Sequence, residues 1–214
     1  MSEIPRFDLS QYVSMLFGTL FVNYDWQGNE QLNKELEELL LEQERTNQGV
    51  NRSNAGGWQS AGNLIHLDHP AIKKLKHQIE TVVFNLTDQI IRDDGQQRSF
   101  RVLIDAWGNI NRRGDYNVVH THPNCMWSGC YYVNPGKPDP NIPQNGLLEL
   151  LDPREAANYI QIPNTILDGR QFVSIAESRM LLWPSWLKHM VHPYAGDDHR
   201  ISIAYNVNVI EDRP

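Results

Sequence analysis

Residues 117–134 read NVVHTHPNCMWSGCYYVN, two short β-rich runs separated by Pro123 and Asn124. Valine, threonine and tyrosine favour strands, whereas proline and asparagine favour turns. Runs of the same kind lie on both sides at roughly even intervals: FRVLIDAW (100–107), GLLELLD (146–152), FVSIA (172–176), RMLLWP (179–184), HMVHPY (189–194) and RISIAYNVNV (200–209). A series of about eight such strands separated by turn residues predicts a double-sheet jelly roll.

The first part of the chain has a different pattern. The apolar segment 15–22 (MLFGTLFV) predicts a strand. A helix is predicted through 31–45 (QLNKELEELLLEQER), with Asn29 as its cap. One face of this helix is apolar and consists of Leu32, Leu36, Leu39 and Leu40.

A second helix is predicted to begin at Pro70, to be capped at 68–69, and to end near 93–95. The residues between the two helices, 46–63, are rich in Asn, Gly and Ser and read as a long loop. Long loops in compact domains are often functional, so we expect this one to cover a site as a lid, with Trp58 contributing to it.

Helices followed by clustered strands indicate a mainly β (α+β) fold, a double-stranded β-helix of the jelly-roll or cupin-like type with N-terminal buttressing helices. We predict one domain, 1–214, with helical support from 1–95 and a jelly-roll core over 98–210. A chain of 214 residues can bury a core of its own without disulfides.

Composition excludes several classes of protein. The net charge of −7 argues against binding to nucleic acid. No apolar run reaches the ~18 residues that a membrane helix needs, and the N-terminus lacks the pattern of a secretory signal, so we expect a cytoplasmic protein. Cys125 and Cys130 are five residues apart and would point to opposite faces of a strand, so we interpret them as packing residues rather than a disulfide.

The histidines indicate chemistry. His120 and His122 lie in a predicted strand, where residues two apart project to the same side and could share one metal ion. His189 follows the apolar segment WPSWLK and is the preferred third ligand, with His192 as its competitor. Ligand sets on one face of a metal, with open positions opposite, are typical of iron oxygenases.

A second constellation suits a dicarboxylate. Arg200 and Ser202 would project to the same face of a strand, eleven residues beyond His189. The planar guanidinium matches a carboxylate with two parallel hydrogen bonds. Tyr132 lies on the run that follows His122.

Together these segments resemble the 2-oxoglutarate and Fe(II)-dependent oxygenase superfamily. The stretches HTHPNCMWSGCYYVN, WPSWLKH and RISIAYN look like the prolyl-hydroxylase-like branch of bacteria and phages, as do WGNINRRGDYN and SNAGGWQS. The resemblance covers most of residues 52–208. It implies Fe(II) as cofactor, 2-oxoglutarate as co-substrate and O2 as oxidant.

Carried over by position, the resemblance makes His120 and His189 iron ligands and makes Arg200 the partner of the far carboxylate of 2-oxoglutarate. Ser202 would add a hydroxyl to that carboxylate, and Tyr132 would reach the co-substrate from the opposing strand. His122 stands where most of the superfamily has Asp or Glu, which is a departure.

The departure leaves the third ligand with two candidates. Either His122 itself completes a three-histidine set, which we favour, or a carboxylate such as Asp115 supplies it. A neutral imidazole removes one negative charge from the metal site, which alters its balance with anionic ligands. Asn109 and Asn117 are candidate partners that orient the imidazoles.

The resemblance implies hydroxylation of a substrate coupled to oxidative decarboxylation of 2-oxoglutarate. We expect a small-molecule or peptide substrate, with a peptidyl proline or another amino-acid side chain as the leading hypothesis, and a homodimer is left open. Four tryptophans are candidates to line the substrate pocket, and Arg112 could touch an acidic substrate: Trp58, Trp107, Trp127 and Trp183.

Two rival functions remain at this stage. One is a three-histidine jelly-roll metalloenzyme that does not use 2-oxoglutarate. The other is a non-catalytic binding module on the same scaffold. Neither requires an Arg-x-Ser pair eleven residues after a ligand histidine.

Overall fold

Eleven strands and two α-helices form the body of the protein in a computed structural model, which describes residues 8, 11, 14–15, 17–91, 98–159, 162, 165 and 168–212. The elements are, in chain order, β1 (Val22–Asp25), α1 (Glu30–Thr46), β2 (Asn54–Ala55), β3 (Trp58–Gln59), the 3-10 helix η1 (Leu64–His66), α2 (Pro70–Ile90), β4 (Ser99–Asn111), β5 (Tyr116–His120), β6 (Trp127–Asn134), β7 (Leu148–Leu151), the 3-10 helix η2 (Ala157–Tyr159), β8 (Arg170–Val173), β9 (Arg179–Pro184), β10 (His189–Val191) and β11 (Arg200–Asp212).

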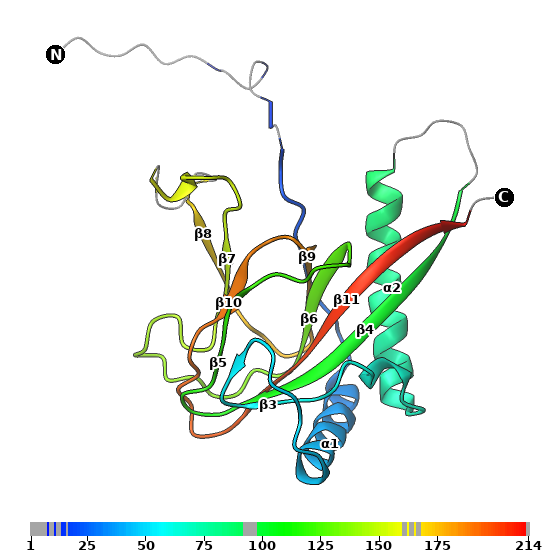
Figure 1. Cartoon of the computed structure of the whole chain (residues 1–214), viewed down its shortest axis with the longest axis vertical. Coiled ribbons are helices and arrows are strands. Elements are labelled where there is room, and N and C mark those ends of the chain that lie inside the picture. Colours follow the sequence, from blue (N-terminus) through cyan, green and yellow to red (C-terminus); the bar gives the residue numbers. More distant parts are fainter. Residues whose placement is uncertain are drawn as a thin grey trace.

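The strands form two antiparallel sheets. The larger has the order β1-β9-β6-β11-β4-β3 and the smaller the order β2-β5-β10-β7-β8. Figure 1 shows the helices against the outer side of the larger sheet, and the smaller sheet on its opposite side. All eight strands predicted from residue 98 onward are present, and the expected mainly β jelly roll with N-terminal helices is confirmed.

The larger sheet is covered on both faces because residues alternate along each strand. On β11, Ile201, Ile203 and Tyr205 are buried on the helix side. The intervening Arg200 and Ser202 are buried on the side that faces the smaller sheet. The helix-side residues build the core, and the alternate set builds the space between the sheets.

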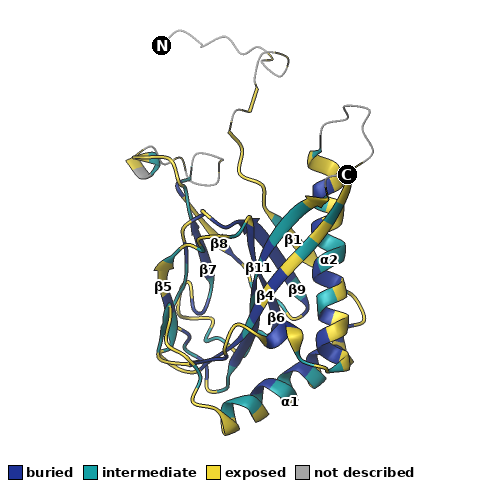
Figure 2. Cartoon of the chain, turned by 45° about the vertical axis from the view of Figure 1, so that its right-hand side comes forward, coloured by how far each residue is buried: buried dark blue, intermediate teal, exposed yellow. Residues whose placement is uncertain are grey.

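The two helices bury one stripe each against this sheet, and Figure 2 shows the dark buried stripe beside exposed outer faces. On α1 the stripe contains Leu32, Leu36 and Leu40, which are at most 2% exposed. Burying one such side chain stabilises the fold by about 1.5–3 kcal/mol. Gly108 on β4 permits the close approach of α1, because a Cβ there would lie 2.3 Å from Leu40 Cδ2.

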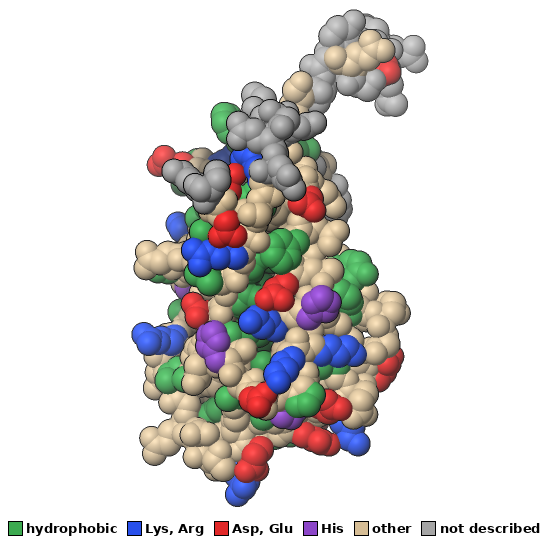
Figure 3. Space-filling view, turned by 90° about the vertical axis from the view of Figure 1, so that its right-hand side faces the viewer, with side chains coloured by type: hydrophobic (Ala, Val, Ile, Leu, Met, Phe, Trp, Pro, Cys, Tyr) green, Lys and Arg blue, Asp and Glu red, His purple; other side chains and the backbone are tan. Residues whose placement is uncertain are grey.

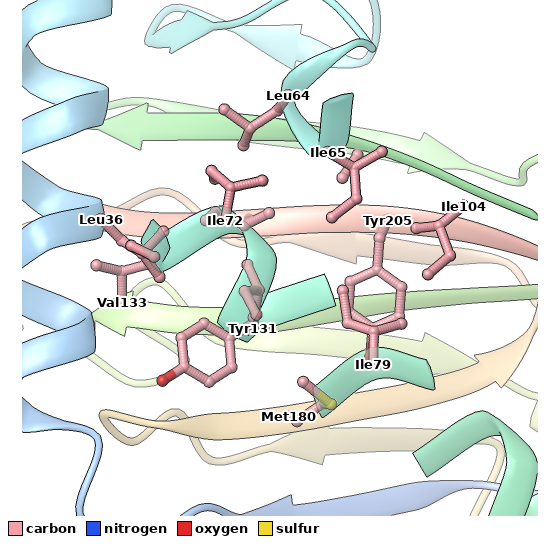
Figure 4. Packing of buried hydrophobic residues seen from close by; sticks show 14 of the residues in the cluster. Leu36, Leu64, Ile65, Ile72, Ile79, Ile104, Tyr131, Val133, Met180 and Tyr205 are labelled. Atoms are coloured by element: carbon pink, nitrogen blue, oxygen red, sulfur yellow. The ribbon is translucent and has the colours of Figure 1, made fainter. Parts of the chain in front are cut away.

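The core continues under α2, where aliphatic side chains of the helix meet aromatic ones of the sheet (Figure 4). The labelled members of this cluster are Leu36, Leu64, Ile65, Ile72, Ile79, Ile104, Tyr131, Val133, Met180 and Tyr205. They come from both helices, η1, β4, β6, β9 and β11, so this packing joins the N-terminal segment to the jelly roll.

Asn29 stands at the N-cap position of α1 as predicted, but its side chain makes no capping hydrogen bond. Its amide instead donates to Gln78 Oε1 at 3.1 Å and to Tyr131 Oη at 3.0 Å. A buried amide must be hydrogen-bonded, and these partners on α2 and β6 satisfy it while fixing the start of α1.

Several predicted boundaries were wrong. The strand expected over 15–22 begins only at Val22, and the large apolar side chains described before it are exposed, Phe17 by 96%. Segment 46–63 is not a free loop, since β2 pairs with β5 and β3 pairs with β4. Helix α2 ends at Ile90, and the predicted stop at 93–95 lies outside the described residues.

Figure 3 shows the face on the α2 side, where acidic and basic side chains are interspersed without a large patch of one sign. Among the helices of the described residues, none has the length and apolar composition needed to cross a bilayer.

Candidate active site

A cavity lies between the two sheets and has about 470 Å³ of space, including its open mouth. Its walls come from β4, β5, β6, β7, β9, β10 and β11, with one residue each from the segment before β2 and from the loop after β5. The lining residues are Ser53, Trp107, Asn109, Asn117, His120, His122, Gly129, Cys130, Tyr132, Leu148, Trp183, His189, Val191, Arg200, Ser202 and Ala204.

Three histidines converge in this cavity. One ring nitrogen from each of His120, His122 and His189 lies within 4.8 Å of the others, and the Nε2 atoms of His122 and His189 are 3.2 Å apart. Their ring centroids are separated by 4.3–5.1 Å. No other group of three metal-binding side chains occurs in the described part of the chain.

Backbone carbonyls orient two of these rings. His120 Nδ1 lies 2.7 Å from the carbonyl oxygen of Val118, and His189 Nδ1 lies 2.9 Å from that of Leu187. A carbonyl can only accept a hydrogen bond, so Nδ1 holds the proton in both rings. Each Nε2 therefore presents a lone pair toward the cluster, as in metal-binding histidines whose second nitrogen is hydrogen-bonded.

The environment keeps the imidazoles neutral. Burial lowers the pKa of His122 to about 4 and that of His189 to about 3, with nearby histidines adding to the effect. Burial also lowers the pKa of His120. A metal ion binds neutral imidazole, so these three nitrogens are available as ligands at neutral pH.

The expectation that His120 and His122 share one strand was wrong, because β5 ends at His120 and His122 follows in the loop. Its backbone N–H donates to the carbonyl of Ser185, which ties that loop to the turn after β9. The pairing of β5 with β10 also shifts by one residue between Asn117 and His120. Such a bulge redirects side chains and is frequent beside active sites.

Arg200 occupies the deeper part of the cavity together with Ser202 and Tyr132. Arg200 is 1% exposed, its guanidinium lies 5.1 Å from the centre of the Tyr132 ring, and Nη1 is 3.4 Å from Ser202 Oγ. Ser202 pairs directly with Tyr132 in the register of β11 with β6. The structure thus brings the three residues predicted to bind a dicarboxylate into the same cavity as the histidines.

Two polar atoms of this group lack hydrogen-bond partners. Arg200 Nε and the Tyr132 hydroxyl are buried without a hydrogen bond, and within the described ranges no carboxylate forms an ion pair with Arg200. An unpaired buried cation is strongly unfavourable. The donor set therefore fits an anionic ligand, and the histidine cluster above it fits a divalent metal ion.

The alternative ligands lie elsewhere. Asp115 Oδ2 accepts a hydrogen bond of 2.7 Å from the backbone N–H of Arg112 in the turn between β4 and β5. His192 Nε2 contacts Glu149 Oε2 at 2.6 Å, beyond the end of β10. Neither residue lines the cavity.

Several other predicted site residues are not at the cavity. Trp58 and Trp127 are buried in the helix-side core, where they support the sheet instead of a lid. Arg112 forms a bidentate ion pair with Glu44 on α1, with N–O distances of 2.6 and 2.7 Å. These positions follow from strand alternation, which sends the side chains of β3 and the start of β6 toward the helices.

Trp107 and Trp183, by contrast, do line the cavity. The ring of Trp107 lies 5.6 Å from that of His122, and the ring of Trp183 lies 5.0 Å from that of His189. Asn109 and Asn117 also line it, although no hydrogen bond joins either to a histidine. Their predicted orienting role is taken by backbone carbonyls.

Cys130 is one of the lining residues that the sequence interpretation did not assign to the site. It is buried on β6, two residues before Tyr132 and therefore on the same face, and it is a free thiol. The alternation of the strand was the signal that could have found it.

Comparison with known proteins agrees with this geometry. The family model described as "Putative 2OG-Fe(II) oxygenase" matches residues 105–206, which contain the histidines and Arg200. No curated protein matches the chain.

Solved structures share the fold at low identity. A prolyl-4-hydroxylase from Pseudomonas putida has a TM-score of 0.59 at 12% identity, covering 88% of this chain and 91% of its own. A prolyl hydroxylase from Trichoplax adhaerens in complex with a peptide fragment has a TM-score of 0.57 at 16% identity, covering 88% of this chain and 83% of its own. HygX from Streptomyces hygroscopicus, with nickel and 2-oxoglutarate bound, has a TM-score of 0.59 at 12% identity, covering 89% of this chain and 83% of its own.

The identities of 12–16% make these structures evidence for the fold alone. The family match over residues 105–206 adds sequence evidence for the part of the chain that builds the cavity. Residues 105–206 are therefore similar in sequence to the putative 2OG-Fe(II) oxygenases that this family model describes.

Proposed function

We propose that this protein is an Fe(II)- and 2-oxoglutarate-dependent hydroxylase acting on a peptidyl proline or another amino-acid side chain. One observation supports the proposal above all: three neutral imidazoles and a buried, unpaired guanidinium share one cavity. A divalent metal ion would bind the imidazoles, and a dicarboxylate would pair with the guanidinium.

In this proposal His120, His122 and His189 hold the iron through their Nε2 atoms. The carbonyls of Val118 and Leu187 keep two of the rings in the required tautomer and orientation. Three protein ligands on one side leave positions for co-substrate and oxygen on the other. When bound, iron and 2-oxoglutarate supply oxidative decarboxylation by O2, coupled to hydroxylation of a C–H bond.

Arg200 would bind the far carboxylate of 2-oxoglutarate by charge-assisted hydrogen bonds, with the hydroxyls of Ser202 and Tyr132 beside it. Leu148 and Val191 add apolar side chains to the cavity wall, and Arg200 itself is 1% exposed. Removal of a guanidinium from bulk water strengthens its attraction to a carboxylate.

The peptide part of the proposal is supported by fold similarity to prolyl hydroxylases, one of them holding a peptide fragment. Trp107, half-buried next to His122, offers an apolar surface against which a pyrrolidine ring could pack. We place the enzyme in the cytoplasm, which suits the free thiols of Cys125 and Cys130.

The test is anaerobic titration with Fe(II) and then 2-oxoglutarate, followed through the visible metal-to-ligand charge-transfer band. We expect the band in the wild type, its loss in His189→Ala, and a much higher 2-oxoglutarate requirement in Arg200→Ala. Arg45→Ala is the matched control, since Arg45 is exposed on α1 and pairs with Glu42. Iron binding without a band would reject the use of 2-oxoglutarate and favour a three-histidine metalloenzyme of another kind.

The second measurement is catalytic. Prolyl peptides should increase the release of succinate from 2-oxoglutarate and O2, and the peptide should gain one oxygen atom by mass spectrometry. If the charge-transfer band forms but no peptide gains oxygen, the peptide assignment fails while the cofactor assignment stands. Absence of both iron binding and succinate release would instead favour a non-catalytic binding module.

A further inference from the structure

We infer that the cavity takes up one small monoanion in addition to 2-oxoglutarate, and that this monoanion is normally a carboxylate of the substrate. The inference rests on the proposed function and concerns the charge of the residues around the site. Among the substrates of the proposed function, it selects those with a free carboxylate near the carbon that reacts, such as a C-terminal proline, over a proline inside a peptide.

The wall of the cavity has no acidic residue. Its sixteen lining residues include one cation, Arg200, and three histidines, but neither Asp nor Glu. The protein as a whole has 26 acidic and 19 basic residues, so a shortage of carboxylates does not explain this. The cavity is therefore locally positive inside a negatively charged protein.

Three carboxylates are close in sequence to lining residues, but none of them lines the cavity. Glu149 alternates with Leu148 on β7, is buried on the other face of that strand, and pairs with His192 and Arg170. Asp105 is exposed on β4, two residues before Trp107, and Asp115 lies in the turn after β4.

The two weak acids of the wall do not supply a negative charge either. Burial raises the pKa of the Cys130 thiol and that of the Tyr132 phenol, and the attraction of Arg200 opposes this only in part. Both groups thus enter the charge count as neutral.

A count of formal charges in the cavity with metal ion and 2-oxoglutarate bound then leaves an excess of positive charge. A divalent metal ion on three neutral imidazoles and the guanidinium of Arg200 bring three positive charges. The dianion of 2-oxoglutarate removes two of them, and one remains. An uncompensated charge among buried side chains is unfavourable and attracts a counter-ion.

The position of His122 makes this charge accessible. His122 lies after the end of β5, on the loop, and is less buried than His189. Its neighbour Trp107 is also only half-buried. A small anion entering through the mouth would therefore meet the metal-binding group before it meets Arg200.

The first experiment titrates sodium azide, a small monoanion, into the anaerobic protein loaded with Fe(II) and 2-oxoglutarate. We expect saturable binding of one azide per protein, seen as a shift of the charge-transfer band and as heat in calorimetry. The shift must occur without loss of the band, since loss would mean that azide had displaced 2-oxoglutarate. No saturable binding, or binding only by displacement, overturns the inference.

The variant His122→Asp tests the charge argument because it adds one negative charge at the site. Azide should bind roughly tenfold or more weakly in this variant. His77→Asp adds the same charge on the exposed face of α2 and should leave azide binding unchanged. Equal affinity in His122→Asp and the wild type would contradict the charge count, and wild-type stoichiometry remains decisive if the variant does not fold.

Competition then identifies the source of the anion. N-acetylproline contains a free carboxylate, whereas N-acetylprolinamide is its neutral analogue. Displacement of azide by the acid but not by the amide supports a substrate carboxylate. Competition by chloride but by neither organic probe would reject the carboxylate and leave a halide site. A missing charge-transfer band at the outset would reject the proposed function itself, so the two failures are distinguishable.

Discussion

Replacement of Arg200 by methionine should stabilise the ligand-free protein while abolishing its response to 2-oxoglutarate. Arg200 is 1% exposed and has no carboxylate partner among the described residues. Its compensation is limited to the Tyr132 ring at 5.1 Å and a long contact of 3.4 Å to Ser202. Methionine has a similar length and no charge, so it removes the desolvation penalty and keeps most of the packing.

The size of the effect follows from two opposing terms. Desolvation of an ion in a protein costs several kcal/mol, and a desolvated cation–π contact returns about 2 kcal/mol. We therefore expect Arg200→Met to raise the free energy of unfolding of the ligand-free protein by about 1–2 kcal/mol. For a chain of this size that corresponds to an increase in Tm of roughly 2–8 °C.

The loss in free energy of 2-oxoglutarate binding should be larger than the gain in free energy of unfolding. Removing one partner of a buried charged pair costs about 2–5 kcal/mol of binding, so the Kd for 2-oxoglutarate should increase by roughly 30-fold or more. The assay is thermal unfolding with Ni(II), with and without 2-oxoglutarate. The wild type should gain Tm with the ligand, whereas the variant should not.

Arg179→Met is the matched control. Arg179 is partly buried on β9, but it pairs with both carboxylate oxygens of Asp25 at 2.7 Å and does not line the cavity. Its replacement should lower stability by about 1 kcal/mol and leave the response to 2-oxoglutarate intact. If Arg200→Met were as destabilising as Arg179→Met, the guanidinium would not be an unsatisfied charge and the reasoning would be refuted.

Three further outcomes are expected. His189→Ala should bind Fe(II) at least about 100-fold more weakly, whereas His192→Ala should retain its affinity, as measured by equilibrium dialysis. Gly108→Ala should lower the free energy of unfolding by about 1–3 kcal/mol in urea titration, because the added Cβ would lie 2.3 Å from Leu40 Cδ2. Because the pKa values of His122 and His189 are lowered to about 4 and about 3, their stabilising effect on the metal-free protein is present above pH 6.5 and is lost as the pH falls toward 3. His122→Gln should therefore show a smaller decrease of Tm between pH 6.5 and pH 4, and an equal decrease would contradict this assignment.

The predicted strands could be found from sequence because they are buried on alternating faces. On β11 both faces are covered, yet Ile201 and Ile203 still alternate with Arg200 and Ser202, which marks the strand and its two sides. That alternation also allowed Arg200 and Ser202 to be placed together before their surroundings were known. The helices were predictable for the same reason, since their apolar stripes face a single surface.

The remaining errors concern elements that depend on distant partners. Strands β2 and β3 contain two residues each and exist only because β5 and β4 offer free edges. The apolar segment 15–22 has strand-like composition but gains no partner before Val22. The strand propensity of a segment does not show whether a sheet edge is free to pair with it. The secondary structure of such segments is therefore predicted incorrectly.

His122 illustrates the same limit within the candidate site. Period-two alternation correctly joined it to His120 in space, although β5 ends before it. The convergence arises from the bulge between Asn117 and His120 and from the hydrogen bond between the His122 backbone and Ser185. Neither feature can be recognised from the spacing of the residues. His120 and His122 were therefore grouped correctly, although the single strand assumed for both was wrong.

The charge of the cavity connects these observations. Burial of Arg200 without an ionic partner among the described residues is expected to lower the stability of the ligand-free protein, and burial also favours the neutral form of the histidines. A chain selected only for stability would replace these groups with apolar residues of similar size. Their presence in one cavity that lacks any carboxylate means that the missing negative charge must come from outside the chain. The cavity therefore indicates the charge of its ligand more clearly than the shape of its ligand. Anionic ligands are the first that should be tested.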